Sequence, residues 1–132
     1  MQPKALTKTS KKIFNKIIER LNGSDSCRIG EPNRAFMQLS VEKLYTHNAG
    51  TEYSFCHYFK QNGDMCQDPE MVFLLHKSGR VYPIMFQQAI PPVYQQSMYM
   101  KDGEWKLNPR TQREHAKFAN MWFKNRKEQQ NI

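Results

Sequence analysis

Four side chains that can bind a metal ion or carry a proton lie close together near the middle of the sequence. His57, Asp64, Asp68 and Glu70 fall within fourteen residues of one another. Their carboxylates offer the hard oxygen ligands that magnesium and calcium prefer, and the imidazole can act as a general base beside a bound ion. The segment is therefore a candidate pocket for a metal-dependent enzyme.

The spacing of these residues nevertheless matches no catalytic motif. The carboxylates lack the glycine and the alternating ligand pattern of an EF-hand loop. The chain has no Gly-rich phosphate loop, no Gly-x-Ser-x-Gly elbow and no His-Glu-x-x-His zinc motif. Asp64 follows the hairpin dipeptide Asn62-Gly63 and Asp68 precedes a proline, positions where aspartate commonly fixes a turn. We therefore expect a structural hairpin here and assign no catalytic residue.

The cysteines support neither a disulfide framework nor a metal centre. Cys27, Cys56 and Cys66 are odd in number and form no Cys-x-x-Cys pair. A zinc site from Cys56, His57, Cys66 and His76 is an alternative that the spacing does not favour. Catalysis by the Cys66 thiol would require an activating base and oxyanion donors. We predict that the protein holds no metal and no cofactor.

The net charge of +8 is concentrated in the two end segments of the chain. Residues 1–22 carry six positive and one negative side chain, residues 23–100 carry six and seven, and residues 101–132 carry eight and four. A partner of opposite charge is therefore expected to contact the ends of the sequence rather than its middle.

Both end segments have the 3.6-residue period of amphipathic helices. The pattern predicts a first helix over residues 10–22, capped by Thr9 or Ser10, and a last helix over residues 109–127 that starts after Asn108. Each helix carries basic residues opposite its apolar face. These are Lys12, Lys16 and Arg20 in the first helix, and Arg110, Arg113, Lys117, Lys124 and Lys127 in the last.

The intervening segment, over residues 36–100, changes to the two-residue alternation of strands with one buried face. Alternation places His57 on the aromatic face of its strand. The pattern predicts five strands, over residues 36–45, 52–60, 71–76, 81–87 and 93–100. Residues 23–34 are expected to form a loop, and Asp102-Gly103 to end the sheet. The sequence thus predicts a single α+β domain over residues 1–132, with a five-stranded antiparallel meander sheet flanked by N-terminal and C-terminal helices.

No apolar run approaches the ~20 residues that a membrane-spanning helix requires. The lysine-rich N-terminal segment also lacks the apolar block of a signal peptide. We therefore expect a cytoplasmic protein with no membrane partner.

Several short blocks of the sequence follow one another in a characteristic order. They are His57-Tyr58-Phe59, Gln61-Asn62-Gly63-Asp64, Asp68-Pro69-Glu70-Met71-Val72-Phe73, Tyr82-Pro83-Ile84-Met85-Phe86-Gln87-Gln88 and Val93-Tyr94-Gln95. This order resembles an uncharacterised small-domain family of bacterial plasmids and conjugative transposons, and the resemblance covers residues 36–100. That family has no established activity, so the resemblance implies a mobile-element setting without site residues. Cys66 departs from the family's pattern.

The basic helix faces are the best functional lead in the sequence. Clustered Lys and Arg release counterions when they neutralise phosphates, and Tyr94, Tyr99 and Trp105 offer stacking surfaces. We therefore expect a non-enzymatic binding or accessory protein of a mobile genetic element that contacts DNA or RNA. The predicted contacts are Lys12, Lys16, Arg20, Arg110, Arg113, Lys117 and Lys124.

Two alternatives stay open at this stage. The first is a protein–protein interaction module that uses an exposed strand edge or the glutamine-rich surface of Gln87, Gln88, Gln95 and Gln96. The second is a metal-dependent enzyme that uses the segment from His57 to Glu70. The sequence leaves the oligomeric state undetermined.

Overall fold

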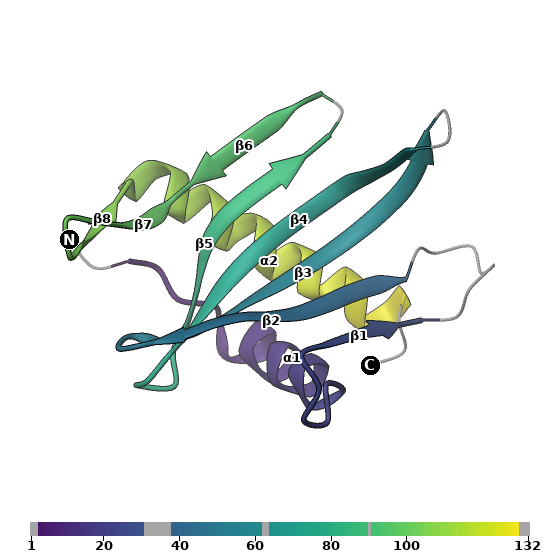
Figure 1. Ribbon diagram of the computed structural model, residues 1–132, viewed down its shortest axis with the longest axis horizontal. Helices are drawn as coiled ribbons and strands as arrows, with labels where there is room; N and C mark the ends of the chain where they lie inside the picture. Colours follow the sequence, from purple (N-terminus) through teal and green to yellow (C-terminus); the bar gives the residue numbers. More distant parts are fainter. Residues whose placement is uncertain (1–2, 31–37, 62–63, 90, 130–132) are drawn as a thin grey trace.

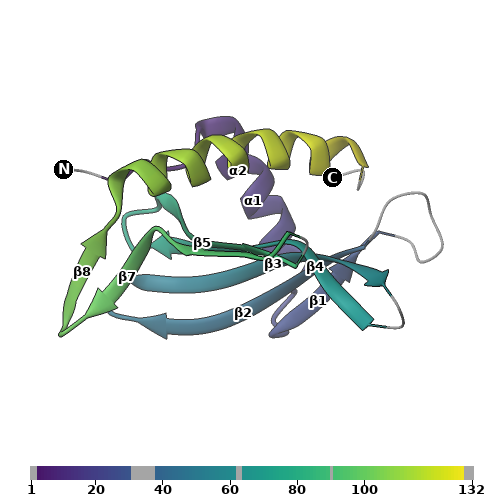
Figure 2. The same ribbon diagram turned by 90° about the horizontal axis from the view of Figure 1, so that it is seen from above.

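The computed structural model describes residues 3–30, 38–61, 64–89 and 91–129, and it gives the side-chain surroundings of these residues except 58–61, 64–68, 126 and 128–129. In chain order the elements are α1 (Lys8–Glu19), β1 (Ser26–Ile29), β2 (Leu39–His47), β3 (Gly50–Gln61), β4 (Asp64–His76), β5 (Val81–Gln88), β6 (Val93–Gln96), β7 (Met98–Lys101), β8 (Glu104–Leu107) and α2 (Pro109–Gln129). The two helices lie on the same face of the main sheet (Figures 1 and 2). The predicted α+β class, with an antiparallel sheet and a helix near each end, is confirmed.

Helix α1 begins earlier than predicted because Thr7, rather than Thr9 or Ser10, caps it. The Thr7 hydroxyl oxygen accepts a hydrogen bond from the Ser10 backbone N–H at 3.2 Å, which satisfies one of the N–H groups that every helix start leaves unpaired. The helix ends at Glu19 instead of residue 22, while α2 continues to Gln129, past the predicted end at residue 127.

The main sheet has six strands, so the prediction of five is wrong. Its strands lie in the order β1-β2-β3-β4-β5-β6, and each pairs antiparallel with its neighbour in the sequence. The additional strand, β1, lies in the segment that was expected to be a loop. Its Cys27 and Ile29 point to the core while Ser26 and Arg28 are exposed. Four residues offer only two apolar positions, which is too few for a recognisable alternation.

The predicted fifth strand is broken at Ser97, which separates β6 from β7. Ser97 is completely buried. Its backbone N–H donates to the carbonyl of Ile84 at 2.9 Å and its hydroxyl donates to the carbonyl of Pro83 at 3.2 Å. These two carbonyls lie at an irregularity in the pairing of β4 with β5. The serine thus anchors the chain at the point where it leaves the main sheet.

Strands β7 and β8 form a separate two-stranded hairpin beyond Ser97. Asp102 and Gly103 join them with φ angles of 53° and 78°, the positive pair that a tight hairpin turn of this hand requires. The prediction that Asp102-Gly103 ends the sheet is therefore wrong, because these residues form the turn of a further hairpin. The Asn62-Gly63 turn prediction falls outside the described residues, although β3 and β4 pair up to Gln61 and Asp64.

Each face of the main sheet has its own apolar cluster. The helix-covered face buries the larger one, which includes Leu6, Ile13, Phe14, Ile17, Leu39, Val41, Phe55, Met71, Phe73, Val81, Ala119, Trp122 and Phe123. The smaller cluster lies on the other face and consists of Val72, Leu74, Tyr82, Ile84 and Met98, with Trp105 and Leu107 packed against it. The β7–β8 hairpin therefore provides part of the cover for the face that the helices leave open.

The segment before α1 joins the sheet to α2. The backbone N–H of Leu6 donates to the carbonyl of Val81 at 2.8 Å. The buried amide of Gln112 accepts from the Lys4 N–H at 2.7 Å and donates to the Lys4 carbonyl at 2.6 Å. One α2 side chain thus pairs both backbone groups of a residue that lies 108 positions earlier.

Gly50 begins β3 at a position where the chain approaches the backbone of β4 closely. Its φ is 149°, and a Cβ atom placed there would lie 2.1 Å from the carbonyl oxygen of Leu75. A backbone oxygen in a paired strand cannot move aside easily, so this position requires glycine on steric grounds.

We therefore expect Gly50→Ala to lower the free energy of unfolding by more than about 3 kcal/mol, because clash and backbone strain add. Gly23→Ala is the matched control: Gly23 has a φ of 87° but nothing within 4 Å of the added carbon. Its cost should be about 1–2 kcal/mol, from the left-handed backbone alone. Urea unfolding of both variants measures the difference, and equal losses would show that the clash at Leu75 is relieved without cost.

Candidate functional site

His57 and Glu70 are not brought together, because they lie on opposite faces of the main sheet. His57 is 3% exposed and packs edge-on against Trp122 of α2, with ring centroids 5.9 Å apart. This confirms its predicted place on the aromatic face. Glu70 instead bonds Ser54 and Gln87 on the face away from the helices. The side chains of Asp64 and Asp68 lie outside the described residues, although their backbone belongs to β4.

The Glu70 carboxylate ties three strands together. One oxygen accepts a hydrogen bond from the Ser54 hydroxyl of β3, and the other accepts from the Gln87 side-chain amide of β5. Ser54 is buried and Gln87 is half-buried. A carboxylate whose two oxygens already hold charge-assisted bonds is poorly placed to bind a metal as well. The hydrogen bonds indicate that Glu70 has a structural role, in which it links β4 to β3 and β5.

The described residues contain no cluster of three His, Cys, Asp or Glu side chains that could hold a metal ion. Burial raises the pKa of the Cys27 thiol, an effect that the nearby Arg20 only partly opposes. A thiol with a raised pKa stays protonated at neutral pH and is a weak nucleophile. The side chain of Cys66, the candidate nucleophile in the sequence, is outside the described residues.

His47 and Glu52 form a pair that the sequence did not single out. The Nε2 atom of His47 lies 2.8 Å from the Glu52 carboxylate, and its Nδ1 atom accepts the Ala49 backbone N–H at 3.2 Å. A histidine that acts as a general base needs one ring nitrogen available for the substrate's proton. Here both nitrogens are engaged, so the pair orients the β2–β3 turn instead of forming a catalytic dyad.

The seven predicted nucleic-acid contacts are all exposed. They are Lys12, Lys16 and Arg20 on α1, and Arg110, Arg113, Lys117 and Lys124 on α2. The helices pack against each other on one face of the sheet (Figure 2). We refer to these exposed residues together as the basic surface. Arg110 is partly neutralised, because its Nε atom lies 3.4 Å from the carboxylate of Glu114.

One part of this surface is hollowed into a small cleft between the helices. The cleft has a volume of about 270 Å³ and is lined by Thr9, Lys12, Ile13, Lys16 and Lys127. Three lysines from elements at opposite ends of the sequence therefore converge on one place. The helical periodicity placed Lys127 on the basic stripe of its helix, but the convergence depends on how α1 and α2 pack, which periodicity does not report.

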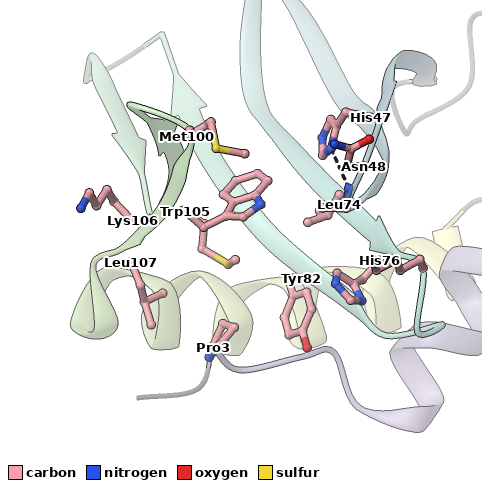
Figure 3. Close-up of a pocket in the computed structure, with 14 residues that line it drawn as sticks. Pro3, His47, Asn48, Leu74, His76, Tyr82, Met100, Trp105, Lys106 and Leu107 are labelled. Atoms are coloured by element: carbon pink, nitrogen blue, oxygen red, sulfur yellow. Dashed lines mark hydrogen bonds between the residues drawn. The ribbon is translucent and has the colours of Figure 1, made fainter.

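A larger cavity of about 780 Å³ lies at the end of the sheet, between the β7–β8 hairpin and the turns that follow β2 and β4 (Figure 3). Its floor is formed by Leu74 and Tyr82 from the smaller apolar cluster. Two of the lining side chains, Trp105 of β8 and His47, pack against each other with ring centroids 5.8 Å apart. Sequence reasoning missed this cavity because its walls come from five separate segments.

The fold and these surfaces define an α+β domain in which two basic helices cover one face of an antiparallel sheet and a hairpin shelters a cavity on the other. The chain belongs to the family described as a domain of unknown function, DUF6908, which it matches over residues 8–132. No curated protein and no solved structure matches the chain significantly. Among the described residues, no helix is both long and apolar enough to cross a membrane.

His115 of α2 is a buried imidazole with a structural role. Its Nδ1 atom lies 3.0 Å from the Ser97 hydroxyl and its Nε2 atom lies 2.9 Å from the Gln95 side chain. Burial lowers the pKa of His115, and the nearby Glu114 carboxylate opposes this only partly. The ring therefore links α2 to β6 and to the serine where the chain leaves the sheet.

The lowered pKa of His115 predicts a pH-dependent stability. Below about pH 6.5, the ordinary value for histidine, the unfolded chain binds a proton that the folded chain resists. The free energy of unfolding should therefore fall as the pH decreases from 7.5 to about 5. In His115→Gln this decrease should be smaller, even if the variant is less stable at every pH. Urea unfolding across the range measures both slopes, and identical slopes would contradict the assignment.

Proposed function

We propose that this protein is a non-enzymatic accessory protein of a bacterial mobile genetic element, acting in the cytoplasm, and that it binds nucleic acid through the outer surfaces of α1 and α2. The observation that carries the proposal is the convergence of Lys12, Lys16 and Lys127 on one cleft. No acidic residue is among the described residues that line the cleft. Clustered ammonium groups without a carboxylate partner attract phosphates and release counterions when they bind them.

The arrangement of the remaining basic residues supports a phosphate-backbone contact. Arg113, Lys117 and Lys124 recur at helical spacing along the exposed side of α2 and extend the basic surface beyond the cleft. Contacts of this type hold a nucleic acid in place and read no sequence directly. We therefore expect binding that is strongly dependent on salt and weakly dependent on sequence.

A protein–protein contact through β6 is the second candidate. This short strand forms one edge of the main sheet, so one side of its backbone has no partner strand in the part of the chain that the structure describes. Its Tyr94 is 62% exposed, and Gln95 and Gln96 are exposed beside it. An exposed edge can add a strand from another chain. The metal-dependent alternative has less support, because the sheet separates His57 from Glu70.

The test is a charge reversal of the cleft. We expect Lys12→Glu, Lys16→Glu and Lys127→Glu, combined in one variant, to weaken binding of a fluorescently labelled DNA or RNA oligonucleotide about tenfold or more. Fluorescence anisotropy between about 50 and 200 mM salt should also show a slope of log affinity against log salt that is shallower by about 3, roughly one unit for each lost phosphate contact.

A matched control separates the cleft from the net charge. Arg28→Glu, Arg80→Glu and Lys101→Glu change the charge equally at exposed positions outside the two helices. This variant should keep most of the affinity and the slope. Equal losses in the two variants would reject a specific basic surface. The absence of any binding by the unmodified protein at low salt would reject the function itself.

A further inference from the structure

The cavity beside Trp105 has the dimensions and lining of a small-molecule site. Its volume of about 780 Å³ lies within the roughly 300–1,000 Å³ typical of ligand pockets. Leu74 and Tyr82 are 1% and 7% exposed and form an apolar floor, and Met98 adds to it from β7. Such a floor favours the flat apolar face of a ring over a fully hydrated solute.

Trp105 gives the cavity an aromatic wall. The indole is half-buried and packs at the edge of the smaller apolar cluster. Figure 3 shows it above Tyr82, with His47 and His76 to its right. No hydrogen-bond partner for the indole N–H lies among the described residues. An aromatic ligand in this space can pack against the indole plane.

The polar groups at the rim are basic. Lys77 is exposed and forms no ion pair with a described residue. Lys106, on the opposite side, lies 3.4 Å from the Glu104 carboxylate, which reduces its effect. None of the fourteen lining residues is acidic. Asp102 and Glu104, in the hairpin, are the nearest carboxylates in sequence to the cavity's walls, followed by Glu52, which bonds His47.

His76 adds a directed hydrogen-bond donor to this side of the cavity. Its Nδ1 atom accepts the Ser78 backbone N–H at 3.1 Å. The neutral ring therefore carries its proton on Nε2, and this atom bonds to no described residue. A single wall thus provides an ammonium group from Lys77 and a ring N–H from His76.

We propose that the cavity binds a small aromatic anion, with its ring over Leu74 and Tyr82 beside Trp105 and its carboxylate, sulfonate or phosphate at Lys77 and His76. The apolar floor and the indole favour an aromatic ring in the ligand, and the basic groups among the lining residues favour a negative charge on it. The cavity lies on the face away from the helices, so this proposal stands independently of nucleic-acid binding.

Two fluorescent probes test the proposal, because they share a ring system and differ in charge. We expect 1-anilinonaphthalene-8-sulfonate to bind the folded protein at one site and to accept energy from Trp105. The neutral N-phenyl-1-naphthylamine should bind about tenfold more weakly, since it lacks the charge-assisted hydrogen bond. Trp105→Ala should weaken both probes, while Lys77→Met should weaken only the sulfonate, again about tenfold.

Lys101→Met is the matched control, since Lys101 is an exposed lysine of β7 that does not line the cavity. It should leave both affinities unchanged. Each variant should unfold cooperatively in urea and keep the near-ultraviolet circular dichroism spectrum of the unmodified protein. These two measurements show that the probe binds to the native state. Equal affinity for the two probes, equal effects of Lys77→Met and Lys101→Met, or no saturable binding of the sulfonate would overturn the proposal.

Discussion

Four phenylalanine side chains, one from each of α1, β3, β4 and α2, hold the helix layer on the sheet. Phe14, Phe55, Phe73 and Phe123 have no exposed surface. The rings touch in pairs. The distance between ring centroids is 5.2 Å for Phe14 with Phe55, 5.2 Å for Phe73 with Phe123, and 5.3 Å for Phe55 with Phe73. Each such pair stabilises the fold by roughly 0.5–1.5 kcal/mol, in addition to the stabilisation that comes from burying its apolar area. This cluster holds both helices on one face of the sheet. It therefore determines where the basic surface and the cavity beside Trp105 lie.

The placement of both helices on one face has two consequences. With their apolar sides turned inward, α1 and α2 present the lysines and arginines of the basic surface to solvent. The second face of the sheet is then left to the short β7–β8 hairpin, whose two strands cover only part of it. The cavity beside Trp105 lies where this cover is incomplete, so the basic surface and the cavity are on opposite sides of the same sheet.

The sequence predicted these features to the extent that they depend on periodicity. Long helices reveal themselves through a 3.6-residue repeat, and the seven predicted basic residues are indeed exposed. β1 was missed because it has only two apolar positions, and the break at Ser97 was missed because a small polar residue gives no strand-ending signal. The separation of His57 from Glu70 required the register of β3 against β4, which changes at an irregularity after Cys56. The cavity depends on tertiary packing alone.

The hydrogen bonds between Lys4 and Gln112 bear on how the chain folds during synthesis. Every strand of the main sheet pairs with its neighbour in the sequence, so hairpins can form as the chain leaves the ribosome. The segment before α1 must wait for α2, which is made about a hundred residues later. Until then the sheet exposes the apolar face that carries Phe55 and Phe73. A nascent chain halted before α2 is therefore the form of this domain most exposed to aggregation.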